Sequence, residues 1–316
     1  MTKKQTDIII ANPIYDVVFK NLMTTSKGTN KDIARYFFGA ILGEEITDIE
    51  FLPQEYTYHK PKSKKNTKSK NEVLTVIRLD FVATIRTKNG EFKKVLIEIQ
   101  KSHKPHDLLR FRTYLGEQYK QKDMITVKDN RIEKAIPIVI IYMLGFELSG
   151  INTIIVKVPR QYIDLICNGV IDERHPFIES LTHDGYFIQI PRINRNTFVD
   201  WENCSDLIKI LSLFEQDNFI DNEAKTIKRY TYSITDKNLK KMVETLEFIA
   251  ADPKIRRAMQ EEYWAAQDEI MWEKGYVALK RENAAQAKEI ARLRRQLGLN
   301  GANVKKKTSR LAKYEE

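Results

Sequence analysis

Cysteine is scarce in this sequence. Cys167 and Cys204 are the only two among 316 residues, and they lie far apart, in no spacing that binds a metal. A disulfide framework and a cysteine-based zinc site are therefore excluded. We expect both side chains to be free thiols in the reducing environment of the cytoplasm.

Long hydrophobic runs are also missing. The longest, AIPIVIIYML at residues 135–144, is about half as long as a membrane-spanning helix needs to be. The amino-terminus lacks the apolar segment of a secretory signal peptide. These absences predict a cytoplasmic protein that has no membrane partner.

Acidic residues are outnumbered. The chain carries 53 lysines and arginines against 43 aspartates and glutamates, which gives a net charge of +10 at pH 7. Such an excess favours an anionic partner, and nucleic acid is the most common one. The hydrophobic share of 42% is typical of a globular protein with a proper core.

The most informative stretch is residues 72–101, NEVLTVIRLDFVATIRTKNGEFKKVLIEIQ, which predicts a β-hairpin. Its first strand covers residues 73–85 and its second covers residues 94–100, and both are rich in β-branched side chains. Alternation gives each strand one wholly apolar face and one face that also carries polar groups. The polar groups that matter for chemistry are Asp80, Glu98 and Gln100.

The turn decides which residues of the two strands face each other. A two-residue turn would put apolar side chains opposite polar ones along the whole pair. A three-residue loop at residues 88–90, with its glycine in the left-handed conformation that a G1 bulge requires, matches apolar with apolar. We therefore predict the longer loop, which pairs Phe81 with Ile97 and sets Asp80 opposite Glu98.

Two carboxylates directly opposite each other on a sheet repel unless a cation lies between them. A divalent metal would satisfy both, and oxygen ligands suit Mg²⁺, which keeps several waters and is shared with a phosphate substrate. Gln100 shares the face of Glu98 and could orient a water or a phosphate oxygen. The alternative is that the two carboxylates are solvated charges paired with Arg78 or Lys94.

The order of these residues resembles a known motif. Asp80, followed by residues 98–100 (EIQ) at the end of a hairpin, looks like the signature of the PD-(D/E)xK nuclease superfamily. Residues 15–20 (YDVVFK) and 109–114 (LRFRTY) are similar to one branch of it, the recombination-promoting nucleases and transposase-like proteins. The resemblance covers residues 12–145 well and the remainder loosely.

Two positions depart from the superfamily pattern. Leu79 precedes Asp80 where a proline is usual, and Gln100 replaces the lysine, as it does in the resembling branch. The resemblance implies a Mg²⁺ site, with Mn²⁺ or Ca²⁺ as alternatives, in which Asp80 and Glu98 bind the metal and Gln100 assists catalysis. Asp16, near the start of the first helix, would complete the metal shell; alternatively it is a carboxylate favoured by the helix dipole.

The implied activity is that of a metal-dependent DNA endonuclease with little sequence preference. It would be linked to DNA recombination or to mobile elements, and RNA is an alternative substrate. Because the superfamily lysine is absent, a second hypothesis is a catalytically inactive DNA-binding or assembly module of the same fold.

A lysine-rich segment precedes the hairpin. Residues 60–70, KPKSKKNTKSK, contain six lysines and no apolar residue, which predicts a loop between strands. Lys62, Lys64 and Lys65 are candidates for contacts with DNA phosphates, and such binding would weaken with salt. The alternative is an ordinary solvated loop.

A helix is expected to follow the hairpin, from Pro105 to about Gln121. Its predicted apolar stripe consists of Leu108, Phe111, Leu115 and Tyr119. Arg112 and Tyr114 lie off this stripe, so we expect them on the exposed side, either as phosphate contacts or as part of a solvated helix face.

Residues 135–144 read as a strand that is buried on both faces. We therefore predict an α/β fold with a PD-(D/E)xK, restriction-endonuclease-like core, in which helices flank a central mixed β-sheet. Residues 1–250 would form the nuclease-like domain, 251–298 a helical arm and 299–316 a basic disordered tail. Further helices are expected at residues 13–24, 30–43, 198–216 and 237–250, and further strands at 152–158 and 185–190.

The latter part of the helical arm follows a heptad repeat. The positions on its seam are Trp272, Tyr276, Leu279, Asn283, Gln286, Ile290, Leu293 and Leu297. Asn283 at an inner position would fix the register at some cost in stability. The pattern predicts a short coiled coil and a homodimer, or alternatively a helix that docks on its own domain.

Overall fold

The computed structural model describes most of the chain. The described residues are 8–25, 28–52, 55–59, 74–78, 81–100, 105–127, 130–194, 200–221, 223–234 and 236–296. They fall into two compact units, Met1–Gln260 and Glu261–Glu316. One long helix, α7 (Pro253–Gln296), belongs to both units.

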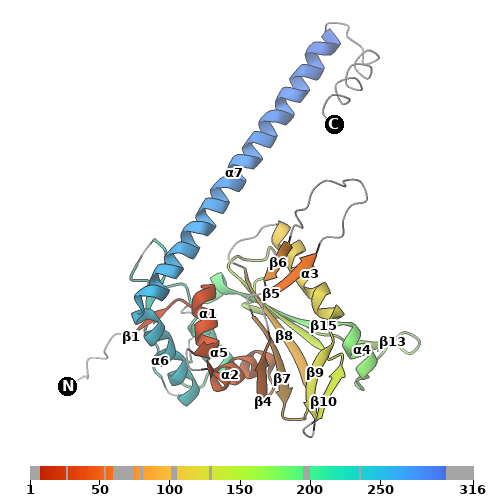
Figure 1. The fold of residues 1–316 in the computed structure, drawn as a ribbon, viewed down its shortest axis with the longest axis vertical. Helices are drawn as coiled ribbons and strands as arrows, with labels where there is room; N and C mark the ends of the chain where they lie inside the picture. The colour runs from red at the N-terminus through yellow and green to blue at the C-terminus, as the bar shows by residue number, and fades with distance from the viewer. Residues whose placement is uncertain are drawn as a thin grey trace, which may run out of the picture. The chain divides into compact units, whose positions relative to one another are not determined.

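A six-stranded mixed β-sheet forms the centre of the first unit (Figure 1). In sheet order the strands are β12 (Ile155–Val158), β15 (His183–Gln189), β11 (Ile138–Leu144), β8 (Phe92–Gln100), β7 (Phe81–Thr87) and β4 (Ile46–Phe51). Strands β8, β11 and β15 are parallel, and the other neighbours are antiparallel. The prediction of an α/β fold with a central mixed sheet is confirmed.

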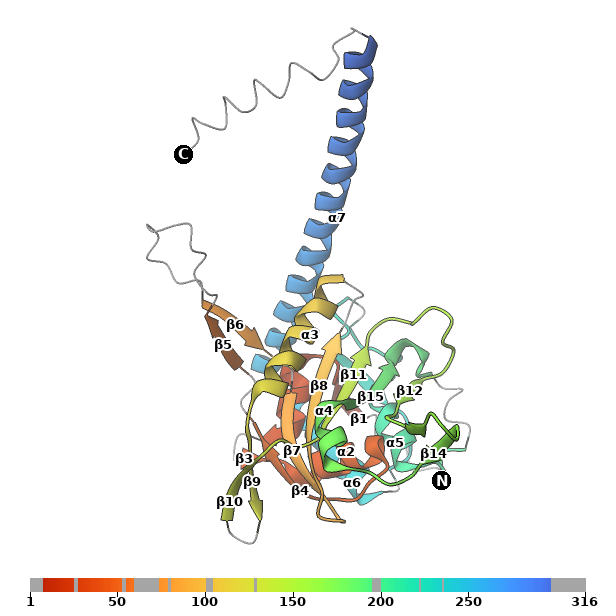
Figure 2. The same cartoon turned by 90° about the vertical axis from the view of Figure 1, so that its right-hand side faces the viewer.

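Helices cover both faces of this sheet (Figures 1 and 2). On one face lie α1 (Asp16–Met23) and α2 (Lys31–Leu42), whose Phe19 and Phe38 rings pack on Phe81 at centroid distances of 5.9 and 5.7 Å. On the opposite face, α3 (Pro105–Lys120) packs through Phe111 on Tyr142 of β11. Each face of β7 and β8 is therefore buried, since even their polar-bearing face lies under a helix.

The hairpin of β7 and β8 has the predicted register. Phe81 pairs with Ile97 and Ala83 with Val95. The loop at residues 88–90 closes with the Gly90 N–H donating to the Thr87 carbonyl at 2.9 Å, and Gly90 has a φ of 81°. That left-handed conformation strains any residue with a side chain, which is why glycine stands there.

The first predicted strand, residues 73–85, is wrong as a single element. Residues 74–78 form β6 (Leu74–Arg78), which pairs with β5 (Glu55–His59) in a separate two-stranded sheet, and β7 begins only at Phe81. Residues 79 and 80 lie outside the described residues. A continuous run of β-branched residues does not show where one strand ends and the next begins with a different partner, because β6 and β7 favour the same residue types.

The first unit also contains three further two-stranded sheets and four more helices. The pairs are β1 (Ile8–Ala11) with β16 (Ile227–Tyr230), β9 (Asp123–Val127) with β10 (Asn130–Lys134), and β13 (Tyr162–Asp164) with β14 (Gly169–Ile171). The helices are α4 (Pro176–Leu181), α5 (Asp206–Ser212), α6 (Lys237–Ala251) and the start of α7. The short pair β2 (Thr24–Thr25) and β3 (Gly28–Thr29) joins α1 to α2, and the 3₁₀ turn spans Ile190–Arg192.

Several predicted boundaries shift. The first helix starts at Asp16 rather than at residue 13, because Asn12 forms a turn in which its side chain accepts from the Ile14 N–H. The helix expected at residues 198–216 is reduced to α5, which Ser205 caps by accepting from the Ile208 N–H. Within the described part of the chain, no helix combines the length and the apolar character that crossing a bilayer requires. Cys167 and Cys204 are free thiols, as predicted.

Lys228 is an unusual feature of β16. Its side chain is buried, and its Nζ donates to the backbone carbonyls of Glu215, at 2.5 Å, and Ser212, at 3.4 Å. Burial lowers the pKa of Lys228 to about 7, although the negative charges of Glu215 and Asp217 oppose the shift. A lysine ordinarily titrates near 10.5, so the folded state binds fewer protons than the unfolded state between these two values.

The free energy of unfolding should therefore rise with pH from about 7 to about 10.5 through this one residue. Between pH 7 and 9 we expect the free energy of unfolding of the wild type to rise by about 2 kcal/mol more than that of Lys228→Met. Urea unfolding at both pH values measures the difference. The exposed Lys237→Met is the matched control and should follow the wild type. Parallel pH profiles for wild type and Lys228→Met would contradict the assignment.

Candidate active site under helix α3

Glu98 lies near the carboxyl end of β8 and is more deeply buried than Asp16, the other described carboxylate of the predicted site. Only 2% of its surface is exposed. It pairs with Tyr142 of β11, and alternation places Leu96, Glu98 and Gln100 on the face of the sheet that α3 covers. Gln100 is buried as well, and its backbone carbonyl accepts from the Gly145 N–H at 2.7 Å. The two predicted site residues of β8 thus share one covered face of a rigid strand.

Arg110 of α3 supplies a positive charge to this face. Its Nη2 donates to Oε1 of Glu98 at 2.9 Å, and the guanidinium carbon lies 5.9 Å from the centre of the Tyr114 ring. Half of the Arg110 side chain remains exposed. A buried carboxylate is costly unless it is paired, so this contact helps to explain how Glu98 is tolerated inside the protein.

A second ion pair joins the start of β8 to the first residue of β9, which lies just beyond the end of α3. Lys94 pairs with Asp123, which opens β9 three residues after the last residue of α3, and both side chains are buried. Asp123 also accepts from the Ile136 N–H at 3.3 Å. Lys94 therefore pairs with Asp123, and not with Glu98 as the alternative interpretation of the sequence suggested. Arg110 near the start of α3 thus contacts the end of β8, and Asp123 beyond the end of α3 contacts the start of β8, so the helix runs antiparallel to the strand.

The buried face of α3 differs from the predicted stripe. Phe111, Tyr114 and Gln118 are buried, whereas Leu108 is 56% exposed. The expectation that Tyr114 is exposed is therefore wrong: only 5% of its surface is accessible, and it packs in the core cluster with Leu96. The sequence misleads here because an amphipathic tyrosine can face either the core or the solvent. Gln118 is also buried, although a polar residue is not expected in an apolar stripe.

The remaining predicted residues are placed unevenly. Asp80, Lys62, Lys64 and Lys65 lie outside the described residues, so their roles stay predictions. Asp16 occupies the first turn of α1 and is half-buried, while Arg112 is exposed on α3. Among the described side chains, which do not include Asp80, no three histidines, cysteines or acids gather in a way that would hold a metal.

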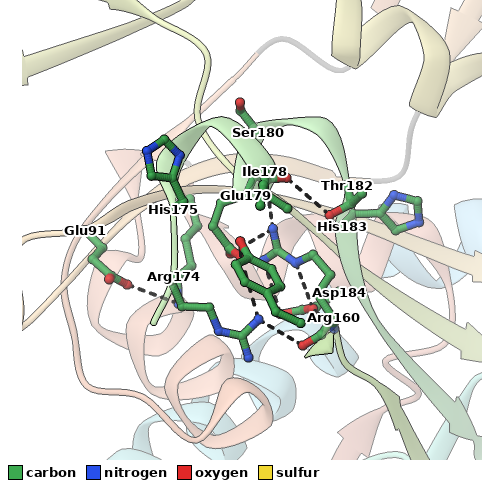
Figure 3. Close-up of polar contacts among 12 residues, drawn as sticks. Glu91, Arg160, Arg174, His175, Ile178, Glu179, Ser180, Thr182, His183 and Asp184 are labelled. Atoms are coloured by element: carbon green, nitrogen blue, oxygen red, sulfur yellow. Dashed lines mark hydrogen bonds and ion pairs between the residues drawn. The ribbon is translucent and has the colours of Figure 1, made fainter. Parts of the chain in front are cut away.

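Sequence analysis missed a second polar cluster, at the start of β15 (Figure 3). The Arg160 guanidinium lies between Asp184, with Nε to Oδ1 at 3.0 Å, and Glu179, with Nη1 to Oε2 at 2.9 Å. Burial alone would raise the pKa of Asp184, but hydrogen bonds and charge from Arg160 outweigh it and lower that pKa.

These three residues line a cavity of about 360 Å³ at the end of the sheet away from Glu98. Arg160 pairs with both carboxylates, and Arg174 also lies 3.7 Å from Glu179, so every carboxylate has a cationic partner, which is typical of a structural link between β15 and α4. No sequence signal points to it, because the partners are 19 and 24 residues apart and belong to no motif.

Comparisons with protein-family models, with curated proteins and with solved structures returned no match. The function is therefore argued from the residues around Glu98. They combine a buried carboxylate, a neighbouring amide on the same face and an arginine that reaches from the helix above to solvent.

Proposed function

We propose that this chain is a Mg²⁺-dependent DNA endonuclease of the PD-(D/E)xK type, which hydrolyses phosphodiester bonds with little sequence preference. The observation that carries the proposal is the register of β7 and β8, in which Phe81 pairs with Ile97. The proposal extends this register by one residue, so that Asp80 stands across from Glu98. Two facing carboxylates on one sheet call for a cation.

The donor chemistry on the α3 face suits such an ion. Glu98 offers carboxylate oxygens and Gln100 offers an amide oxygen, and both types of ligand match Mg²⁺ better than nitrogen or sulfur would. In the proposal Asp80 and Glu98 hold the metal, and Asp16 is a further candidate ligand. When bound, Mg²⁺ would polarise the scissile phosphate and lower the pKa of an attacking water.

The side chains around Glu98 and the predicted DNA contacts have separate tasks in this scheme. Glu98 stands on a central strand that is flanked by β7 and β11, which keeps its carboxylate in place. The half-exposed guanidinium of Arg110 provides positive charge beside the carboxylate, where a phosphate would approach. Gln100 can orient a water through its amide, and Arg112 on the exposed side of α3 can contact the DNA backbone together with Lys62, Lys64 and Lys65.

One observation favours a second candidate, a DNA-binding module without catalysis. Arg110 already compensates the charge of Glu98, so burial of this carboxylate does not by itself require a metal. Gln100 in place of the superfamily lysine points in the same direction, because an amide cannot supply a positive charge.

Nicking of supercoiled plasmid distinguishes the two candidates. Purified wild type and Asp80→Ala are assayed with Mg²⁺ or Ca²⁺ at two salt concentrations. We expect Mg²⁺-dependent nicking by the wild type, weaker at high salt because phosphate contacts release counterions, and none by Asp80→Ala. The matched control is Asp48→Ala, which removes an exposed carboxylate of β4 that is paired with Lys31.

Nicking by Asp80→Ala at the wild-type rate would contradict the proposed site. Absence of nicking by every variant, combined with salt-sensitive DNA binding by all of them, would instead support the inactive module.

A further inference from the structure

A line of exposed side chains runs along the carboxyl-terminal part of α7. We call it the seam, and within the described residues it consists of Trp272, Tyr276, Leu279, Asn283, Gln286, Ile290 and Leu293. The five apolar and aromatic members are 45 to 73% exposed. Large apolar groups lined up on one side of a mostly polar helix mark a surface that normally binds another protein segment.

The spacing along the seam alternates between four and three residues. This 3.5-residue repeat keeps one side of a helix facing a partner helix over several turns. The helix is continuous from Pro253 to Gln296, so no break moves the seam off that side. From Trp272 to Leu293 the seam spans three heptads, or about 32 Å of helix.

We propose that the seam binds the seam of a second copy of this chain, which forms a two-stranded coiled coil. The seam complements itself. Its two polar members, Asn283 and Gln286, stand in the middle, with apolar residues on either side of them. Two copies that run parallel and in register therefore match polar with polar and apolar with apolar at every seam position.

Charges beside the seam add to this match. Glu289 directly precedes Ile290 of the seam and Arg294 directly follows Leu293, so the two lie on opposite flanks. In a parallel pair, an acid and a base at this five-residue separation meet across the interface. The seam itself carries no formal charge, as an interface between helices requires.

The consequence for activity rests on the proposed function. A dimer would carry two copies of the site around Glu98, one for each strand of a DNA duplex. It would therefore cut both strands within one encounter more often than a monomer, which must bind twice.

Sedimentation equilibrium of the full chain over a range of concentrations tests the proposal without DNA or metal. Wild type should approach twice the chain mass of 37.0 kDa, and Leu293→Glu should halve the observed mass by placing a charge in the interface. The control is Val277→Glu, which makes the same kind of change at an exposed apolar position off the seam and should remain dimeric. Circular dichroism checks that the variants keep their helix content.

Three outcomes would overturn the inference: a wild type that stays monomeric at all concentrations, a dimer that persists in Leu293→Glu, or equal loss of mass in Leu293→Glu and Val277→Glu. Because mass is the readout, an inactive but dimeric protein would refute the proposed nuclease and leave the dimer standing. An active monomer would do the reverse.

Discussion

Replacing Glu98 by glutamine is expected to lower the rate of Mg²⁺-dependent DNA cleavage about a thousandfold, since loss of a metal ligand removes several kcal/mol of transition-state stabilisation. The change preserves the shape of the side chain, and the glutamine oxygen can still accept from Arg110, which donates to Glu98 at 2.9 Å. Folding should therefore be nearly unaffected even though the residue is buried. The measurement is the initial rate of plasmid nicking at saturating Mg²⁺.

Glu50→Gln is the matched control for this experiment. Glu50 belongs to β4 of the same sheet, but its side chain is exposed and lies outside the proposed site. Its variant should cut at the wild-type rate. If Glu98→Gln also cut at that rate, Glu98 could not be a metal ligand, whatever the activity of the Asp80 variant.

The hairpin shows what local sequence can predict. The register of β7 and β8 follows from two short-range facts, the position of Gly90 and the need to match apolar faces, and both are visible in the residues themselves. The buried strand β11 was predictable for a similar reason, because an unbroken β-branched run is typical of a central strand.

Other features depend on partners that are distant in sequence. Residues 74–78 have strong strand character, yet β5 rather than β8 is their partner, and composition cannot distinguish the two. Likewise, Arg110 on its own reads as a surface arginine of α3. Its role became visible only when the fold brought it 2.9 Å from Glu98. The sequence could therefore single out Glu98 and Gln100 of β8 as candidate site residues, but not the side chains that surround them.

The buried pair of Lys94 and Asp123 leads to the largest expected effect on stability. Asp123→Ala should lower the free energy of unfolding by about 3–5 kcal/mol, because it leaves the Lys94 ammonium buried without its counter-charge. It also removes the acceptor for the Ile136 N–H. Urea unfolding at pH 7, followed by circular dichroism, gives the difference directly.

A neighbouring pair offers an internal comparison. Lys122, which directly precedes Asp123, pairs with Glu133 of β10, with Nζ to Oε1 at 2.7 Å, but both of these side chains are exposed. Glu133→Ala should therefore cost less than about 1 kcal/mol, since solvent screens the charge that remains. An equal cost for Asp123→Ala and Glu133→Ala would show that burial of the Lys94 pair has no energetic importance.

The double variant Lys94→Met/Asp123→Ala separates the charge from the packing. If the cost of Asp123→Ala arises from the uncompensated ammonium, adding Lys94→Met should recover most of it, because no buried charge is then left alone. The same logic applies at the other end of α3, where Arg110 is half-exposed and Glu98 is not. The chain beyond the end of α3 is thus held by a buried ion pair, and the start of α3 by a pair whose arginine is half-exposed. In the proposed enzyme, the buried pair of Lys94 and Asp123 would hold the chain beyond α3 in place, so that Arg110 at the start of the helix can contact a phosphate of the substrate.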